Sequence, residues 1–373
     1  MAPDQVNVPR RCAVLLGVPV DDLTMDEAIE EIVRLVRLGR EDRTWHQVTT
    51  VNLDFLTNAV GDAGVLRVMQ RASLSLADGM PILWAAKALG TPLRARVAGV
   101  DLVDRLAARS AAGGPSIYFV GAGPGVAEEA ARRLIARYPD ASVRSSTSML
   151  RFAPGVDTDP AVLAEIRAAQ PDVLCVALGN PKQERWIQRY GGDLGVPVLI
   201  GIGGTLDLIV GRRQRAPTWM QRAGLEWIAR MLQEPARLLP RYTRDAAVCV
   251  PRFAGQWWRQ RGWRSDRRWR PVAVERAVDG PVTIRAQGSL DLARDPGIRA
   301  LRLDGVEELR LDLAAVEVAD ARSVATIVAL ARAARTSRLD RARPSVRAAL
   351  GTARVLGLID RHDEGLRPPP AAP

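Results

Sequence analysis

Histidine, cysteine and lysine are scarce in this chain of 373 residues. With only His46 and His362 present, a Ser-His-Asp triad or a histidine-rich metal site would have to use one of these two. The three cysteines are odd in number and far apart, which argues against a disulfide framework or a zinc site and fits a reducing compartment. These absences direct attention to carboxylate, amide and guanidinium groups.

Long apolar runs are also missing. No stretch of about 18 apolar residues occurs, so we expect no membrane-spanning helix. The first twelve residues lack the apolar core of a signal peptide. A hydrophobic content of 47% and a length of 373 residues are typical of a globular protein with two domains. We therefore expect a cytoplasmic protein, soluble or peripheral to a membrane.

The positive charge is concentrated in one segment. Residues 212–270 contain 15 arginines and no lysine against four acidic residues, which equals the net charge of +11 of the whole chain. Arginine and tryptophan together suit the headgroup layer of an anionic membrane, and they equally suit a nucleic acid. Composition leaves both interpretations open. Six of the nine tryptophans lie in this segment: Trp219, Trp227, Trp257, Trp258, Trp263 and Trp269.

Residues 12–250 alternate short apolar runs with helical patterns, which predicts an α/β domain with a Rossmann-like, mostly parallel sheet. Thr24 and Glu27 have the spacing of a capping box at the start of the first helix. Each strand runs into a turn rich in Gly, Asn or Asp, and ligands collect at the carboxyl ends of such strands. The turns therefore predict one site. The expected strands are 47–51, 116–120, 173–177 and 196–200, and the expected helices are 24–38, 125–136 and 181–189.

A second α/β pattern begins at residue 272. We interpret residues 212–250 as an appendage of the first domain that faces a membrane, and residues 251–271 as a basic, tryptophan-rich linker. A small α/β domain is expected over 272–364, followed by a disordered tail at 365–373. Its expected strands are 282–286 and 309–313, and its expected helices are 323–334 and 344–356.

Two glycine-containing turns have the composition of ligand-binding loops. Gly121-x-Gly123-x-Gly125 follows a strand and opens a helix, so that its backbone N–H groups can approach a phosphate. A plain strand–helix turn is an equal alternative, because the spacing is not that of a dinucleotide site. At the second turn, Lys182 and Gln183 fall in the first turn of a helix. Lys182 is one of only two lysines, although a solvated helix start is the alternative.

Asp78 lies in an irregular turn, Asp-Gly-Met-Pro. An aspartate in such a place is usually a cap or a turn former. A loop carboxylate that faces a bound substrate can instead act as the base that deprotonates a hydroxyl.

Together these motifs resemble the WecG/TagA/CpsF family of bacterial glycosyltransferases. The resemblance covers about residues 12–245, and seven motifs occur in order. They are TTVN at 49–52, ADGMP at 77–81, RVAG at 96–99, GAGP at 121–124, GNPKQE at 179–184, GIGGTLD at 201–207, and RAP at 215–217 followed by GLEWIARMLQEPAR at 224–237.

The resemblance implies an inverting, metal-independent transfer of a hexose, N-acetylmannosamine or a related sugar, from a UDP-sugar. The implied acceptor is a sugar linked to polyprenyl diphosphate, used in cell-surface or exopolysaccharide synthesis, and no cofactor is implied. By motif, Asp78 is the candidate general base and Arg96 holds charge near the diphosphate, with Thr50 and Gln183 as further catalytic candidates. The implied substrate-binding residues are Asn52, Gly121, Gly123, Gly179, Asn180, Lys182, Gly203, Gly204, Arg230 and Arg237.

The charges fit such a reaction. UDP leaves as an anion, and without a metal the available positive groups are Arg96 and the helix N-terminus after Gly125. No DxD metal motif lies near the strand ends. We interpret the Asp21–Asp22 pair and the Asp101–Asp104 pair as helix-cap or surface carboxylates.

The resemblance also implies that an arginine-bearing C-terminal segment completes the active site and contacts the inner face of the plasma membrane. Arg230 and Arg237 match that pattern. Pro240 stands where a third arginine is expected, and Arg241 follows it. The basic segment is then the docking place of an anionic, lipid-linked acceptor.

Residues 272–364 resemble a STAS domain, the fold of anti-sigma-factor antagonists. In those proteins the second serine of an Asp-Ser-Ser-Gly run at a helix start is phosphorylated. Here Asp320 is followed by Ala, Arg322 and Ser323, so arginine stands at the phosphorylation position. Ser323 is either a shifted site or, more simply, the N-cap of the helix. We expect a docking or regulatory module with a protein partner.

Two alternatives to an enzyme stay open. In the first alternative, the first domain binds a UDP-sugar without turnover and the second domain relays that bound state. In the second, the arginine- and tryptophan-rich segment binds a nucleic acid. Turnover separates the enzyme from the adaptor, and binding to anionic vesicles compared with oligonucleotides at matched salt tests the third interpretation.

Overall fold

A computed structural model describes residues 9–153, 158–222, 224–261, 273–276, 282–288, 290–301, 303, 306–316, 320–334 and 336–359. The chain forms two compact units. The large unit contains residues 23–82 and 95–246, and the small unit contains the described residues of 1–22, 83–94 and 247–366. Two stretches distant from the C-terminal region in sequence thus belong to the same unit as that region.

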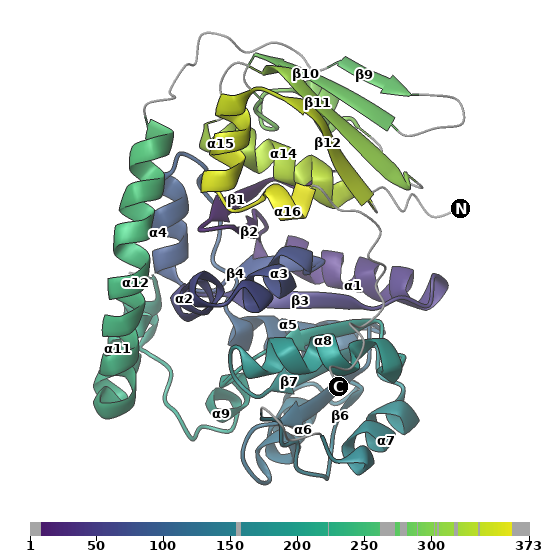
Figure 1. The fold of residues 1–373 in the computed structure, drawn as a ribbon. Coiled ribbons are helices and arrows are strands. Elements are labelled where there is room, and N and C mark those ends of the chain that lie inside the picture. The colour runs from purple at the N-terminus through teal and green to yellow at the C-terminus, as the bar shows by residue number, and fades with distance from the viewer. Residues whose placement is uncertain are drawn as a thin grey trace. The chain divides into compact units, whose positions relative to one another are not determined.

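A six-stranded parallel sheet forms the centre of the large unit (Figure 1). All four strands expected for this domain are present, so the Rossmann-like fold class is confirmed. The sequence did not predict β4 and β6, which have four and three residues. The strands, in sheet order, are β4 (Leu74–Ala77), β3 (His46–Val51), β8 (Val198–Gly201), β7 (Val173–Ala177), β5 (Ile117–Gly121) and β6 (Val143–Ser145).

Helices cover both faces of this sheet, which explains why its strands are almost continuously apolar. Helices α1 (Met25–Glu41), α5 (Gly99–Ala111) and α6 (Val126–Arg137) pack on one face. Helices α7 (Pro160–Ala169) and α8 (Lys182–Leu194) pack on the other. The remaining helices that include residues of this unit are α2 (Leu53–Gly61), α3 (Ala63–Arg71), α4 (Met80–Ala88), α9 (Thr205–Ile209), α10 (Thr218–Arg222), α11 (Glu226–Gln233) and α12 (Pro235–Arg261).

The predicted capping box starts α1. The backbone N–H of Glu27 donates to Thr24 Oγ1 at 3.3 Å, and the N–H of Thr24 donates to Glu27 Oε2 at 2.8 Å. Two N–H groups that the first helical turn leaves without partners are thereby satisfied.

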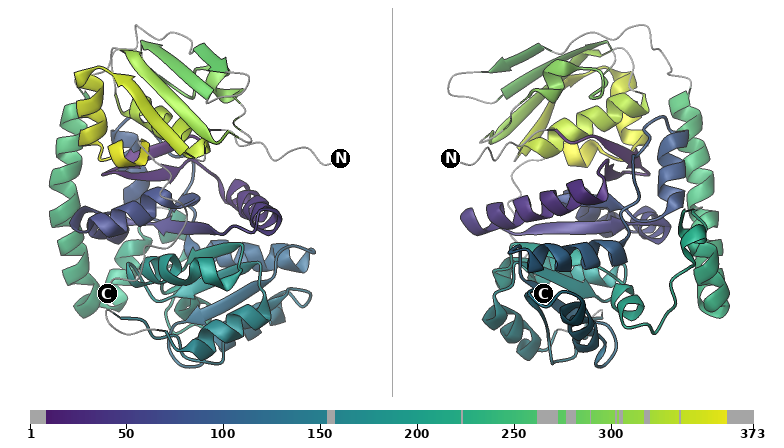
Figure 2. Two further views of the ribbon diagram at one scale, coloured as in Figure 1. Left: turned by 45° about the vertical axis from the view of Figure 1, so that its right-hand side comes forward. Right: turned by 180° about the vertical axis from the view of Figure 1, so that it is seen from behind.

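A four-stranded sheet forms the core of the small unit. Its order is β12 (Thr336–Ala342), β11 (Glu308–Val316), β10 (Val282–Gly288) and β9 (Ala273–Arg276); β9 is antiparallel to β10 and the others are parallel. Buried and more exposed residues alternate along β10, so one face of the sheet is covered. Helices α14 (Ala321–Ala333), α15 (Pro344–Thr352) and α16 (Leu356–Ile359) lie on that face (Figure 2), and the short α13 (Pro296–Arg299) belongs to the same unit.

Asp320, not Ser323, caps helix α14. The Asp320 carboxylate accepts the backbone N–H of Ser323 at 2.8 Å. Ser323 is the third residue of the helix, is fully buried, and exchanges hydrogen bonds with the backbone of Leu290 at 3.1 and 3.2 Å. The expectation that Ser323 is the N-cap is therefore wrong, because Asp320 already takes that position.

The hairpin of β1 (Cys12–Leu15) and β2 (Val18–Asp21) packs on α14, although the sequence assigned it to the first domain. Cys12 and Val14 belong to one apolar core with β10, β11 and α14. Eleven of the thirteen residues of α14 are buried, as expected for a helix covered on more than one side. The Gln256 side chain of α12 adds hydrogen bonds to Val14 O and Leu16 N at 2.9 and 3.1 Å.

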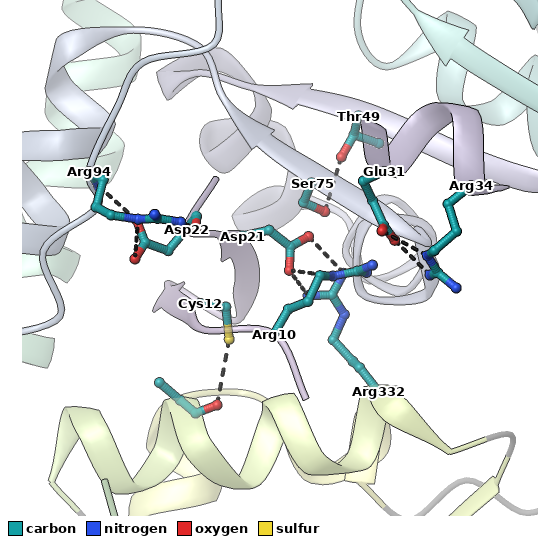
Figure 3. A network of polar contacts seen from close by, with 11 residues as sticks. Arg10, Cys12, Asp21, Asp22, Glu31, Arg34, Thr49, Ser75, Arg94 and Arg332 are labelled. Carbon is teal, nitrogen blue, oxygen red and sulfur yellow. Dashed lines mark hydrogen bonds and ion pairs between the residues drawn. The ribbon is translucent and has the colours of Figure 1, made fainter. Parts of the chain in front are cut away.

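Ion pairs of two buried carboxylates fasten the hairpin (Figure 3). Arg332 of α14 binds Asp21 through two contacts, and Arg10 approaches the same carboxylate to 3.8 Å. Asp22 accepts the backbone N–H of Arg94 at 2.7 Å and pairs with its guanidinium at 3.3 Å. Asp21 and Asp22 are 2% and 4% exposed. Their interpretation as helix-cap or surface carboxylates is wrong, because both are buried counterions of arginines.

Helix α12 continues to Arg261, so the first part of the predicted linker is helical and includes Trp257 and Trp258. Trp263, Trp269 and the predicted tail at 365–373 lie outside the described residues. None of the helices in the described part of the chain is both long and apolar enough to cross a bilayer. The proposed domain boundaries stay predictions.

Candidate functional site

A cavity of about 340 Å³ lies at the carboxyl ends of β3, β4, β7 and β8 in the large unit. Residues of α11 and α12 form another of its walls. The cavity thus lies where an open α/β sheet binds its ligands. Ten of the fourteen predicted site residues line it: Thr50, Asn52, Asp78, Gly179, Asn180, Gln183, Gly203, Gly204, Arg230 and Arg237.

The other four predicted residues are not among those that line the cavity in the described part of the chain. Arg96 pairs with Glu226, which in turn pairs with the lining residue Arg230. Gly121 has a φ of 89°, and a Cβ there would lie 2.7 Å from Ala177 O, so a glycine is required. Gly123 is near Arg212, and Ala122 between the two glycines does line the cavity. Lys182 is exposed at the first residue of α8, as the solvated-helix alternative predicts.

The Asp78 carboxyl group has an unusual electrostatic environment. Asp78 follows β4, and its backbone N–H donates to Val51 O at 2.8 Å. Burial raises the pKa of Asp78 to about 6, against the attraction of Arg230 and Arg96, while Glu226 and Asp101 add to the increase. A carboxyl group with a pKa near neutrality is suited to accept a proton from a substrate hydroxyl and later release it.

Gln183 joins two turns of the cavity. Its Oε1 accepts the backbone N–H groups of Gly179 and Gly203 at 3.1 and 2.9 Å. Its Nε2 donates to Glu184 Oε1 at 2.8 Å, and Asn180 Nδ2 donates to Glu184 Oε2 at 3.0 Å. Three contacts within the protein therefore fix the orientation of the Gln183 amide.

Glu184 is a buried residue of this site that the sequence did not single out. It is fully buried, and burial raises the pKa of its carboxyl group to about 7 despite the two hydrogen bonds that it accepts. One feature of the sequence could have indicated it. Glu184 lies in the first turn of α8 beside Gln183, on the part of the helix where Trp186 and Ile187 are also buried.

Thr50 and Asn52 have local structural partners as well. Thr50 Oγ1 donates to Gly201 O at 3.3 Å, which links the ends of β3 and β8. The Asn52 side chain accepts the backbone N–H of Phe55 at 3.3 Å and caps α2. Each group has further hydrogen-bonding capacity for a ligand.

Of the described residues, four arginines and four acidic residues line the cavity. Arg213 and Arg241 line it beside Arg230 and Arg237, and the sequence did not predict Arg213. Arg213 Nε pairs with Glu234 Oε1 at 2.8 Å, and Arg237 pairs with the same acid. Arg241 is one helical turn beyond Arg237 and therefore lies on the same face of α12. It can take the place of the third arginine that was expected at position 240. Such a wall suits a phosphorylated ligand.

Among the described residues, no three histidine, cysteine, aspartate or glutamate side chains are grouped as a metal site would require. The polar groups of the cavity are instead carboxylates, amides, backbone N–H groups and guanidinium groups. Of these, the guanidinium groups supply the positive charge.

Comparison with known proteins identifies a family model and relatives that match this part of the chain. The family model described as "Glycosyl transferase WecG/TagA/CpsF family" matches residues 13–264. Two similar relatives come from Staphylococcus aureus strains MW2 and NCTC 8325 and are named N-acetylglucosaminyldiphosphoundecaprenol N-acetyl-beta-D-mannosaminyltransferase. Each is 28% identical over 224 residues, which cover 60% of this chain and 85% of the relative.

Proposed function

The chain belongs to the WecG/TagA/CpsF family of glycosyltransferases, and we propose that it transfers a hexose from a UDP-sugar to a polyprenyl-diphosphate-linked sugar. The transfer inverts the anomeric centre and needs no metal. The names of the relatives support N-acetylmannosamine as the sugar and N-acetylglucosaminyl diphosphate as the acceptor headgroup.

The observation that carries this proposal is the position of Asp78 in a cavity whose walls hold arginines. In an inverting transfer the acceptor hydroxyl loses its proton as the anomeric carbon becomes cation-like, and Asp78 is the base that accepts the proton. Thr50, Asn52 and the backbone N–H groups of the glycine turns orient the two sugars. Gln183 acts through the turns of Gly179 and Gly203, whose N–H groups it holds.

Guanidinium groups stabilise the diphosphates. The leaving UDP carries at least two negative charges, and a preorganised cation in a cavity with little water stabilises that charge more strongly than it would in bulk solvent. Arg96 and Arg230 lie near Asp78, where the glycosidic bond to UDP breaks. Arg237 and Arg241, one helical turn apart on α12, bind the diphosphate of the lipid acceptor.

We place the enzyme at the inner face of the plasma membrane. In the part of α10 to α12 that belongs to the large unit, three large apolar side chains are at least half exposed: Trp219 is 63%, Leu232 71% and Leu239 50% exposed. They lie in the segment that holds the excess of arginine. Apolar side chains that enter the headgroup layer, together with arginines that attract anionic lipids, would hold the cavity close to its lipid-linked acceptor.

We propose that the C-terminal region is a STAS-like module without the usual phosphoswitch. A mixed four-stranded sheet with α14 after β11 supports this assignment. Arg322 occupies the first turn of α14 and pairs with Asp291 at 3.4 Å, and Ser323 beside it is fully buried. A kinase would have to unfold the start of α14 to reach Ser323.

The test is a transfer assay with the full chain. Purified protein is incubated with a panel of UDP-sugars and a polyprenyl-diphosphate-GlcNAc analogue in EDTA, beside Asp78→Ala. A disaccharide product that survives EDTA and depends on Asp78 supports the mechanism and identifies the donor. If UDP binds but no donor gives product, the chain is an adaptor. Binding to oligonucleotides but not to anionic vesicles would instead favour a nucleic-acid partner.

A further inference from the structure

Glu226 is a buried acid among arginines of the site, and the proposed chemistry does not use it. It is the first residue of α11 and is 4% exposed. Burial acts to raise the pKa of Glu226, but Arg230, Arg96 and Arg215 together hold it below its usual range. Glu226 is therefore a carboxylate at neutral pH.

The two oxygens of Glu226 bind different guanidinium groups. Oε2 accepts from Arg96 Nη1 at 2.6 Å, and Oε1 accepts from Arg230 Nη2 at 2.9 Å. Arg215 Nε lies 3.9 Å from Oε1, and the remaining nitrogens of that side chain bind both oxygens of Asp101 at 2.6 Å. The carboxylate bridges Arg96, which precedes α5, and Arg230 of α11, and so fixes the distance between them.

A buried carboxylate in this place has a cost that needs an explanation. Its burial carries a desolvation penalty, and its negative charge opposes the binding of a diphosphate by the same arginines. Without it, however, Arg96 and Arg230 would repel each other and turn toward solvent. An anion bridge preorganises the two cations before a substrate arrives.

We propose that Glu226 is a positioning residue that holds Arg96 and Arg230 in register on the side of the cavity that contains Asp78. The inference rests on the proposed function, because it assumes that these arginines stabilise the leaving diphosphate. Glu226 itself contacts no substrate and acts through the two guanidinium groups.

The same bridge sets the electrostatic balance around Asp78. The charged groups that act on the Asp78 carboxyl are Arg230 and Glu226 of α11, Arg96, and Asp101 of α5. Arginines alone would hold Asp78 as a weakly basic carboxylate. Glu226 and Asp101 offset them, which preserves the ability of Asp78 to accept a proton.

The test is Glu226→Gln in the full chain, with kcat and KM measured for donor and acceptor from pH 5 to 8. A glutamine presents an amide N–H to one of the two guanidinium groups, so the bridge is lost. We expect a loss in kcat/KM on the order of 10- to 100-fold, and an inflection of the pH profile at lower pH than in the wild type. Glu129→Gln is the matched control, because Glu129 pairs with Arg133 at 2.6 Å on α6, and should leave both readouts unchanged.

A folded Glu226→Gln variant with the wild-type kcat/KM and pH profile would overturn the proposal. If that variant does not fold, Glu226→Asp decides. It keeps the charge but is one methylene too short to bridge, so the inflection stays in place while kcat/KM falls, and an unchanged kcat/KM contradicts the bridge. The ¹³C carboxyl resonance of Asp78, assigned with Asp78→Asn, should titrate at lower pH in Glu226→Gln. That shift needs no turnover, so an inactive wild type contradicts only the proposed function.

Discussion

The guanidinium of Arg332 holds the carboxylate of Asp21 through two contacts, at 2.7 and 3.1 Å, although the two residues are 311 positions apart. Neither side chain is more than 8% exposed. The pair lies between the second strand of the hairpin and the last turn of α14. It joins the N-terminal hairpin to the C-terminal part of the small unit.

Arg332→Met should destabilise the small unit strongly. Removing Arg332 takes a bidentate partner from a buried carboxylate, and such losses cost about 3–5 kcal/mol. We expect a lower midpoint of urea unfolding, and partial recovery in the Asp21→Asn, Arg332→Met double variant. Arg338→Met is the control, because Arg338 is exposed and pairs with Asp340 only at 4.0 Å. Equal unfolding midpoints for Arg332→Met and Arg338→Met would refute a stabilising role for the Arg332–Asp21 pair.

Catalysis should depend on the ionisation of Asp78. Because the base must be deprotonated, kcat/KM of the wild type should rise with pH through about 6 and level off above it. Asp78→Asn should lower kcat by about 10²- to 10⁴-fold on the plateau above pH 7 and remove the rise through pH 6. A flat profile between pH 5 and 7 would exclude Asp78 as the base.

The same group should reduce stability at neutral pH. The folded-state pKa of Asp78 is raised, so the folded protein loses stability as pH rises from the unfolded value of 3.8 through about 6. Asp78→Asn avoids that loss and should be more stable at pH 7.5 by up to about 3 kcal/mol. The advantage should disappear below pH 4 in thermal unfolding. A variant that is less stable than the wild type at pH 7.5 would show that the carboxylate is stabilised in the folded state.

Gln183→Ala should damage the cavity by loosening its turns. It leaves the N–H groups of Gly179 and Gly203 without their common acceptor, at about 1–3 kcal/mol for each unpaired group. We expect a lower melting temperature and a higher KM for the UDP-sugar. Lys182→Ala, on the exposed neighbour, is the control. Equal melting temperatures for the two variants would show that the hydrogen bonds of Gln183 to the two turns do not stabilise the fold.

Trp219→Ala should weaken binding to anionic vesicles. Trp219 is 63% exposed in the arginine-rich segment, whereas Trp84 is 48% exposed on α4. Co-sedimentation with phosphatidylglycerol vesicles should fall several-fold for Trp219→Ala and stay unchanged for Trp84→Ala. Binding of the wild type should weaken as salt rises, because surface charges are screened. Equal loss in both tryptophan variants would contradict a specific membrane face.

Apolar strands and motif turns were predictable, because local pattern determines them. Strands buried on both faces are continuous apolar runs, and the turn of Gly179 follows one of them. The role of Gln183 was not visible, because its three hydrogen-bond partners are set by tertiary structure. Glu226 was missed for a similar reason: a glutamate at the start of an amphipathic helix gives no sign in the sequence that three arginines surround it.

The course of α12 shows a different limit. Its strongly buried positions are spaced by seven and four residues, as in a packed helix, but polar side chains occupy three of the five. Hydrophobic periodicity therefore fades although the helix continues. The positions are Leu238, Asp245, Cys249, Gln256 and Gln260.

The placement of the hairpin on α14 affects how the chain is made. A ribosome that adds roughly 5–20 residues per second releases Asp21 about 15–60 s before Arg332 exists. During that time Cys12 and Val14 have no core to enter, so the nascent chain exposes an apolar hairpin whose Asp21 lacks the guanidinium of Arg332. A gene truncated after residue 264, where the family match ends, would make this temporary exposure permanent and should give a product that chaperones retain.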